Sequence, residues 1–408
     1  MTDNVQYNPH RRDLLLGAAL APLLLRRAAA QTAGPVRIGV LGDFSGPYSG
    51  ISGEGSAVAA RFAIEDFGGK VLDRPVEVVT ADHQNKPDLG LSIVREWFGP
   101  GNVSFVIDVA NSAIALAIQP LLTETHRIAL YTTVGNSDLI GKACSPLSVL
   151  WPHDTWSNTV APIRALLAQG KKSYFLLAAD YAFGKTPESD ATAAITAGGG
   201  KVLGVARHPL HEHDFSSMLI SAQSSQADVV MPLNGGVDFV NSFKQAVEFR
   251  LTDKQAVVAP IVLLSDIHSL GLEAAKGLQF AQSWYWDQND TTRAWAKRFY
   301  QRQNVMPNDT HAAAYSAVPR YPRAMQKAGT DTAEPVMAAL RSMTVSDMFT
   351  PKGTIRADGK MIFDRYLVHV KSPAESKGPW DYLEITAKIA AADAFRPLSE
   401  SECRLVRS

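Results

Sequence analysis

Residues 36–67, VRIGVLGDFSGPYSGISGEGSAVAARFAIEDF, decide the fold. The apolar run at 36–44 predicts a buried strand, the glycine- and serine-rich segment after it a turn, and residues 54–67 a helix. The same rhythm recurs downstream, with predicted strands at 76–82, 103–109 and 128–133 and predicted helices at 89–98 and 112–125. Apolar, β-branched runs that alternate with helices predict βαβ units around a parallel sheet.

A second block of the chain repeats this rhythm. Its predicted strands are 173–180, 201–206, 227–233 and 259–266. Two consecutive blocks predict an α/β protein of two lobes, each with a doubly wound parallel sheet. After residue 280 the pattern changes to helices at 291–303, 310–328 and 333–343, then strands at 354–355 and 366–370 and an irregular tail. Three helices in a row indicate that the chain returns to the first lobe.

The N-terminus has the pattern of an export signal. Arg11 and Arg12 precede an uncharged run at 14–25, and Ala28–Ala30 follow it. That run of about 12 residues is shorter than the roughly 20 needed to span a bilayer, so we predict a cleaved, twin-arginine-type signal peptide over residues 1–30. A buried N-terminal helix is the alternative. The mature protein is expected in the periplasm and is not expected to span a membrane.

Charge and cysteine content narrow the class of protein further. The 40 Lys and Arg residues balance 40 Asp and Glu residues, and no basic run predicts a nucleic-acid partner. Cys144 and Cys403 are the two cysteines. In an oxidising compartment we expect them to form one disulfide, with two unpaired thiols as the alternative.

The sequence contains no complete motif for catalysis or for cofactor binding. No GxSxG nucleophile turn occurs, and Val58 stands where a dinucleotide-binding GxGxxG motif needs its third glycine. The histidines between His208 and His213 are better explained by a solvated turn than by a metal site. We therefore expect no enzyme, no metal and no cofactor, with an exported α/β hydrolase as an alternative.

The loops after the strands are the expected ligand site, because doubly wound sheets bind ligands beyond the carboxyl ends of their strands. These loops are 43–55, 109–116, 131–139, 179–185, 233–239 and 265–271. Their hydroxyl residues and glycines precede helix starts, where N–H groups and the helix dipole favour an anion. We predict a carboxylate site at Ser112 and residues 133–136; ordinary helix caps and turns are the alternative.

Five short motifs, in this order and spacing, resemble the leucine/isoleucine/valine-binding family of periplasmic proteins. They are the SGP turn at 45–47, Asn111–Ser112, TTVGNSDL at 132–139, DYAFG at 180–184 and Gly235–Gly236. The resemblance implies a type I Venus-flytrap fold with three hinge crossings, a monomer, and an ABC permease as partner. It implies a first lobe of residues 31–153 and 285–352 and a second lobe of residues 154–284 and 353–408. A sensory ligand-binding module of the same fold is the alternative.

The resemblance also implies particular ligand-binding residues between the lobes. In the first lobe they are Asn111, Ser112, Thr133, Gly135 and Asn136, and the family's early tyrosine would fall on Tyr48, with Ile51 as the alternative. In the second lobe they are Tyr181, Phe183, Gly236, Val237 and Asp266. Asp266 would hold the ammonium group of an amino acid, whereas Val237 replaces an aromatic side chain of known amino-acid binders. The ligand is therefore expected to be a small carboxylate, either a branched-chain or other amino acid or an aromatic acid.

Tryptophans gather near two of the expected crossings. Trp151 and Trp156 stand where the chain leaves the first lobe, and Trp284 and Trp286 stand where it returns. If they face the ligand, Trp151 and Trp156 would form walls that stack on a flat molecule. Packing within the hinge is the alternative.

Overall fold

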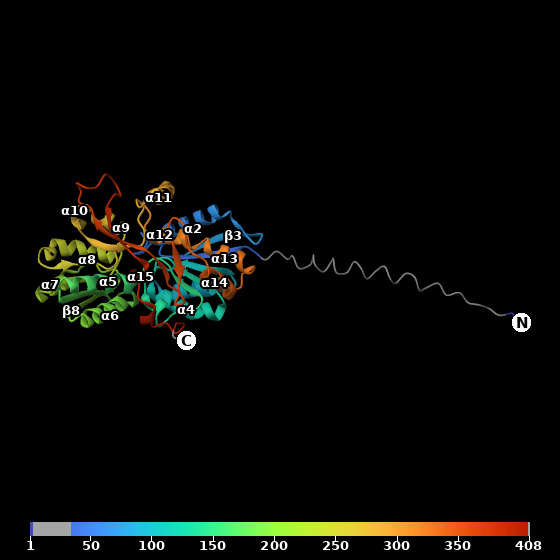
Figure 1. Ribbon diagram of the computed structural model, residues 1–408, viewed down its shortest axis with the longest axis horizontal. Coiled ribbons are helices and arrows are strands. Elements are labelled where there is room, and N and C mark those ends of the chain that lie inside the picture. Colours follow the sequence, from blue (N-terminus) through green and yellow to red (C-terminus); the bar gives the residue numbers. More distant parts are fainter. Residues whose placement is uncertain (3–33, 407–408) are drawn as a thin grey trace.

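The computed structural model describes residues 1–2 and 34–406. Nearly all of the predicted signal peptide therefore lies outside the described residues. The described chain forms two α/β lobes side by side, with the blue, cyan and orange elements in one and the green and yellow elements in the other (Figure 1). This confirms the predicted two-lobed α/β fold.

A six-stranded sheet lies at the centre of the first lobe, in the order β2-β3-β1-β4-β5-β6. Its strands are β1 (Val36–Gly42), β2 (Lys70–Val71), β3 (Arg74–Asp82), β4 (Val103–Asp108), β5 (Ile128–Tyr131) and β6 (Ser148–Leu150). All neighbours pair in parallel except β2, which is antiparallel at the edge. β1 lies inside the sheet, with β3 on one side and β4 on the other, so the loops after β1 and β4 lie side by side.

Helices from two distant parts of the chain cover this sheet. They are α2 (Glu54–Phe67), α3 (Pro87–Phe98), α4 (Ser112–Thr125), α11 (Asp290–Gln303), α12 (Asp309–Ala317), α13 (Arg320–Ala328) and α14 (Ala333–Arg341). One continuous apolar core contains residues of both sets, among them Phe62 and Phe299. The predicted return of the chain after residue 280 is thus observed. The single helix predicted at 310–328 is wrong, because Pro319 separates α12 from α13.

The second lobe contains a four-stranded parallel sheet in the order β10-β9-β7-β8. Its strands are β7 (Ser173–Ala179), β8 (Lys201–His208), β9 (Val229–Leu233) and β10 (Ala256–Val257). Its helices are α5 (Thr155–Ala168), α6 (Ala182–Ala197), α7 (Ser216–Ser225), α8 (Val237–Glu248), α9 (Leu264–Leu270) and α10 (Leu272–Ala275). A separate antiparallel sheet consists of β11 (Gln279–Gln282), β14 (Arg365–Val370) and β15 (Leu383–Ile389).

Two predictions for this lobe are wrong. The strand predicted at 259–266 is replaced by an irregular segment followed by α9, because Pro260 has no N–H to give to a ladder. The apolar residues Ala259 and Val262 are nevertheless buried in a core cluster. The tail predicted to be irregular contains β15, an edge strand whose outer residues are polar and therefore give a weak pattern.

The chain crosses between the lobes after β6, after β11 and before β14, and its C-terminal tail crosses back once more after β15. The hairpin of β12 (Gly353–Ile355) and β13 (Met361–Phe363) packs in the first core through Ile355, Met361 and Phe363. We therefore propose to move the lobe boundary predicted at residue 353 to about residue 364. After β15, the tail with α15 (Ala391–Ala394) returns to the first core through Phe395. A disulfide joins Cys144 to Cys403 there, with Cα atoms 5.6 Å apart.

Candidate functional site

A buried carboxylate organises the loop after β1. Asp43 Oδ1 accepts a hydrogen bond from Gly46 N at 2.7 Å, and Oδ2 accepts from Tyr48 N at 2.9 Å and from Asn85 Nδ2 at 2.6 Å. Three donors from two loops thus converge on one side chain. This network fixes the position of Tyr48 at the surface where the two lobes meet.

A second buried carboxylate stands at the end of β4. Asp108 accepts hydrogen bonds from Ser52 Oγ at 2.8 Å, from Gly53 N at 2.9 Å and from Thr133 Oγ1. Burial raises the pKa of Asp108 to about 6, although these hydrogen bonds oppose the shift. Asp108 and Val109 have φ angles of 74° and 58°, which is strained backbone for a β-branched residue. Strain of this kind is characteristic of functional loops.

The start of α4 combines two features of an anion site. Asn111 caps the helix, because its Oδ1 accepts hydrogen bonds from Ala113 N at 2.9 Å and Ile114 N at 3.3 Å. Ser112, the first helical residue, is 1% exposed, and its Oγ has no hydrogen-bond partner in the described chain. A buried hydroxyl without a partner carries a desolvation cost that an anionic oxygen would remove. α4 lies against α6 of the second lobe, so this helix is at the lobe boundary.

The other residues predicted to bind a ligand carboxylate, Thr133, Gly135 and Asn136, already have partners within the protein. Thr133 donates its hydroxyl to Asp108. Gly135 packs so closely on His153 that a Cβ atom would lie 2.8 Å from the imidazole Cδ2. Asn136 Oδ1 accepts from Asp138 N at 2.9 Å, and its Nδ2 donates to Ala182 O at 3.1 Å, which links the lobes. These residues shape the loop in this structure, and Ser112 offers the free hydroxyl.

Second-lobe aromatic side chains meet the first lobe directly. The hydroxyl groups of Tyr181 and Tyr48 are hydrogen-bonded to each other, and burial raises the pKa of both side chains. The ring of Phe183 lies 6.0 Å from that of Tyr181. Gly236 has φ 59°, and a Cβ atom there would lie 2.7 Å from Pro47 O, so a side chain would prevent this contact. Val237, by contrast, is 43% exposed.

Asp266 lies buried in the first turn of α9. Its Oδ2 accepts a hydrogen bond from Leu263 N at 2.9 Å, which caps the helix. Burial, together with the nearby charge of Asp309, raises the pKa of Asp266 to about 7. Asn308 joins this turn to the first-lobe loop, because its Oδ1 accepts from Ser265 N at 3.0 Å and its Nδ2 donates to Gly50 O at 2.9 Å. A ligand cation that enters here would meet a carboxylate which is otherwise costly to ionise.

The tryptophans near the crossings mostly have packing partners. Trp156 lies between two guanidinium groups, with Arg164 Cζ 5.4 Å and Arg396 Cζ 5.2 Å from its ring centre. Trp284 Nε1 donates to Met348 O at 3.1 Å, within the first core. Trp151 is fully buried in that core, and its Nε1 has no hydrogen-bond partner within residues 34–406. These contacts favour the alternative of hinge packing for Trp156 and Trp284.

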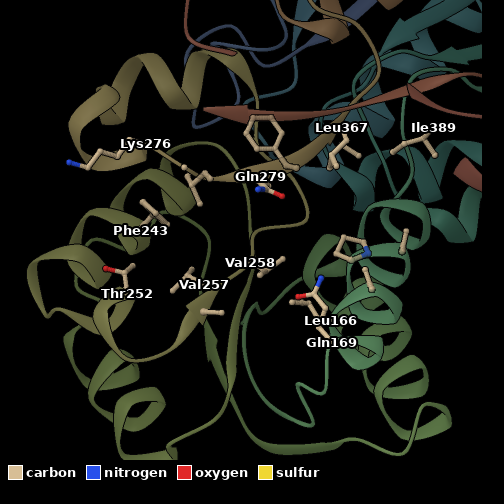
Figure 2. A pocket seen from close by; sticks show the side chains of 18 of the residues that line it. Leu166, Gln169, Phe243, Thr252, Val257, Val258, Lys276, Gln279, Leu367 and Ile389 are labelled. Atoms are coloured by element: carbon tan, nitrogen blue, oxygen red, sulfur yellow. The ribbon is translucent and has the colours of Figure 1, made fainter. Parts of the chain in front are cut away.

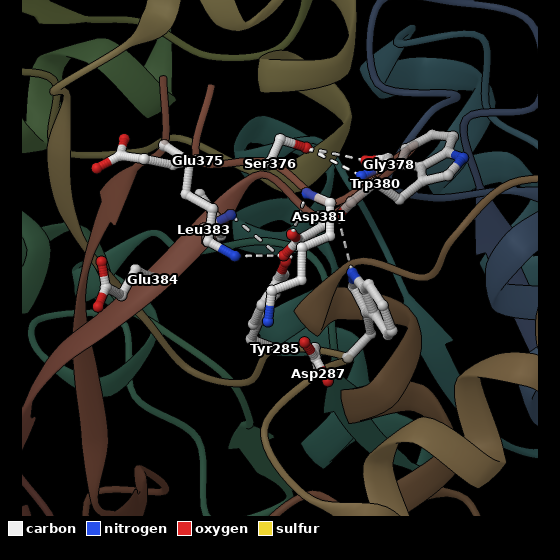
Figure 3. Close-up of polar contacts among 12 residues, drawn as sticks. Tyr285, Asp287, Glu375, Ser376, Gly378, Trp380, Asp381, Leu383 and Glu384 are labelled. Atoms are coloured by element: carbon white, nitrogen blue, oxygen red, sulfur yellow. Dashed lines mark hydrogen bonds and ion pairs between the residues drawn. The ribbon is translucent and has the colours of Figure 1, made fainter. Parts of the chain in front are cut away.

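The second crossing is held by the loop between β14 and β15 (Figure 3). Tyr285 Oη and Trp286 Nε1 both donate to Trp380 O, at 3.2 and 2.9 Å. Trp380 in turn stacks on His268 of α9 at 3.9 Å between ring centres. An ion pair between Lys371 and Asp381 closes the base of this loop.

Buried charges at the hinge gave no signal in the sequence. Lys360 Nζ donates to the carbonyl groups of Leu150, Trp151 and Pro152 at 3.2–3.4 Å and so holds the first crossing. Burial lowers the pKa of Lys360 to about 7. Lys360 lies more than 200 residues from these carbonyls in the chain, so no local motif could identify the contact.

Comparisons with known proteins agree with this architecture. A family model described as periplasmic binding protein matches residues 35–379. The crystal structure of a periplasmic binding protein from Burkholderia mallei is 42% identical, with a TM-score of 0.88, and the match covers 91% of this chain and 99% of that one. A branched-chain amino acid ABC transporter periplasmic ligand-binding protein from Burkholderia xenovorans is 39% identical, with a TM-score of 0.80 and coverage of 91% and 100%.

The curated relatives match a shorter region. A protein of Brucella abortus called Leu/Ile/Val-binding protein homolog 6 is 30% identical over 213 residues, which are 52% of this chain and 54% of that protein. The chain thus spans about half the length of the curated relatives it matches. Among the residues that the structure describes, no helix has the length and apolarity needed to cross a bilayer.

Proposed function

The chain belongs to the periplasmic binding protein family, and we propose that it is the solute-binding component of an ABC importer that captures a small carboxylate between its lobes. The observation that carries this proposal is the buried Ser112 hydroxyl without a partner at the N-terminus of α4. Helix N–H groups and this hydroxyl together suit a carboxylate. The family implies a periplasmic location, and we propose export by the twin-arginine route.

Contacts between the two lobes would stabilise a closed form of the protein, because they can form only when the lobes lie close together. Tyr48 bonds to Tyr181, and Asn136 bonds to Ala182, in each case across the lobe boundary. A ligand that touches both lobes favours this arrangement over a separated one, because the free-energy difference equals its differential affinity for the two states. The closed form would then deliver the ligand to a permease.

We propose an amino acid as the first ligand candidate. Support comes from the name of the 39% identical protein of Burkholderia xenovorans. It also comes from Asp266, a buried carboxylate near the boundary that would pair with an α-ammonium group. An aromatic acid is the second candidate, favoured by the neighbouring rings of Tyr48, Tyr181 and Phe183.

The test is a thermal-shift screen of the purified protein against aliphatic amino acids and against aromatic acids, followed by calorimetric titration of each hit. A ligand at 100 times its dissociation constant stabilises the fold by about 2.7 kcal/mol. Ser112→Ala is expected to weaken binding about tenfold or more, because a hydrogen bond to a charged group is lost. Ser216→Ala is the matched control, since Ser216 begins α7 in the second lobe.

The possible results separate the parts of this proposal. A hit whose affinity Ser112→Ala leaves unchanged would refute the carboxylate site at α4. A hit among amino acids that Asp266→Asn abolishes would support the first candidate. Aromatic acids as the sole hits would support the second. Uptake of the bound solute by cells with and without this protein would test delivery to a permease.

A further inference from the structure

A hollow of about 740 Å³ lies inside the second lobe, between its two sheets. Figure 2 shows three walls around it: Val257 and Val258 with Phe243 on one side, Leu166 and Gln169 of α5 on another, and Leu367 and Ile389 on the third. The residues of the proposed carboxylate site are absent from its lining.

One face of the antiparallel sheet and one face of α5 oppose each other across this hollow. Ala281 pairs with Leu367 and Arg365 pairs with Ile389, so these alternate residues share a face of the sheet. The helix contributes residues spaced by three or four positions: Ala161, Pro162, Ala165, Leu166 and Gln169. Both faces are largely apolar, as expected for surfaces that normally pack together.

The short strand β10 (Ala256–Val257) also lines the hollow. It has two residues, and it pairs with β9 alone within the described sheets. The irregular segment between β10 and α9 runs beside β11, the edge of the other sheet, where Gln282 Nε2 donates to Val262 O at 3.0 Å. The two sheets therefore approach without forming a common ladder. The hollow lies beside this approach and is bordered by α5 and by one face of the antiparallel sheet.

The buried Arg365 side chain lines the hollow and has no ion-pair partner among the residues that the structure describes. Arg365 is 2% exposed; its Nη2 donates to Ala281 O at 3.2 Å, and its Nε has no partner in the described chain. Asp154 and Asp309 act on it electrostatically, but neither forms an ion pair with it among the described residues. Asp393 also lines the hollow, and Glu273 and Lys276 pair with each other at its rim.

We propose that this hollow is a second binding site, which takes a small anionic amphiphile with its apolar part between α5 and the sheet and its acidic group at Arg365. Its volume and mostly apolar walls are those of a small-molecule site. The guanidinium supplies the charged hydrogen bonds that orient an acid. The site is separate from the one proposed between the lobes and does not depend on it.

The experiment uses the purified protein with anilinonaphthalene sulfonate, a fluorescent anionic amphiphile, as the probe. We expect one saturable site, with octanoate displacing the probe and octanol doing so at least tenfold more weakly. Octanol that displaces as well as octanoate would overturn the role of Arg365. Absence of saturable binding would overturn the site.

Variants locate the probe. Ala165→Phe fills the hollow and is expected to reduce probe affinity at least tenfold, whereas Ala168→Phe, on the same helix outside the lining, is expected to leave it unchanged. Arg365→Gln is expected to remove the preference for octanoate; because Arg365 is buried, its thermal transition is checked first. An equal loss of probe affinity in Ala165→Phe and Ala168→Phe would overturn the assignment. A loss of probe binding in Ser112→Ala would overturn it as well.

Discussion

The two lobes share an α/β rhythm but prepare the ends of their strands differently. In the first lobe, Asp43 and Asp108 each accept three hydrogen bonds from within the protein, and these bonds fix their loops. In the second lobe, Tyr181 and Gly236 offer a ring and a bare backbone that contact the first lobe. The first lobe thus supplies a preorganised polar surface, and the second supplies closure.

The hydrophobic cores of the two lobes also differ in how continuous they are. The first lobe has one large cluster of buried apolar residues, whereas those of the second are divided among three. A divided core tolerates a hollow between its sheets, because each part packs separately. This explains why the same rhythm gives a closed core in one lobe and an open one in the other.

The largest expected effect is on the polar network of the first lobe. Asp108→Ala removes the acceptor of three buried hydrogen bonds and is expected to lower the free energy of unfolding by about 3 kcal/mol. Asn234→Ala, at the corresponding strand end of the second lobe, is expected to cost about 1 kcal/mol. Urea denaturation measures both. Equal losses would contradict the difference between the lobes.

The next effect concerns pH. The folded pKa values of Asp266, about 7, and Asp108, about 6, exceed their ordinary value of 3.8, so the folded state binds more protons. Stability therefore falls as pH rises from about 4 through the folded pKa, by at most about 1.4 kcal/mol per pH unit for one group. Asp266→Asn is expected to flatten the slope between pH 4 and 7. Asp108→Asn would act mainly below pH 6, as denaturation at several pH values would show.

A smaller effect is expected from the closure contact. Tyr181→Phe removes the hydroxyl bonded to Tyr48 and is expected to reduce ligand affinity by about 1 kcal/mol, roughly fivefold. Tyr174→Phe is the control, because that hydroxyl bonds to Lys171 O within the second lobe. Calorimetric titration with a ligand from the screen measures both. An equal loss in the two variants would show that the boundary contact has no special role.

The smallest effect is expected where the tail meets the second lobe. Arg164 is exposed, lies over the ring of Trp156, and is 3.9 Å from Glu400. Arg164→Ala is expected to cost about 0.5 kcal/mol, as is usual for exposed charged contacts. Thermal denaturation at low and high salt measures the loss. A loss several times larger would mean that the tail stabilises the second lobe as strongly as it packs on the first.

The fold could be predicted from periodicity because most strands and helices have strong local patterns. The helices at 54–67 and 112–125 were predicted to the residue. The failures have local causes: Pro260 interrupts an apolar run, and the edge strand β15 carries polar residues on most of its surface.

The site was harder to predict because its roles depend on distant partners. Ser112 was predicted from its place at the start of a helix, but Thr133 donates to Asp108, a residue that the sequence did not single out. Trp156 owes part of its packing to Arg396, which is 240 positions away in the chain. A residue predicted to line the ligand site can thus pack at the hinge instead, because the sequence gives the residue type but not the direction in which the side chain points.

The disulfide between Cys144 and Cys403 closes a covalent loop that contains the whole second lobe. A protease that cuts any single peptide bond between these residues would leave one covalent molecule, with both fragments tethered to the first lobe. Such a nicked protein would migrate as two pieces only after reduction. Likewise, a force applied to the two chain ends would bypass the second lobe, because the load passes through the sulfur–sulfur bond.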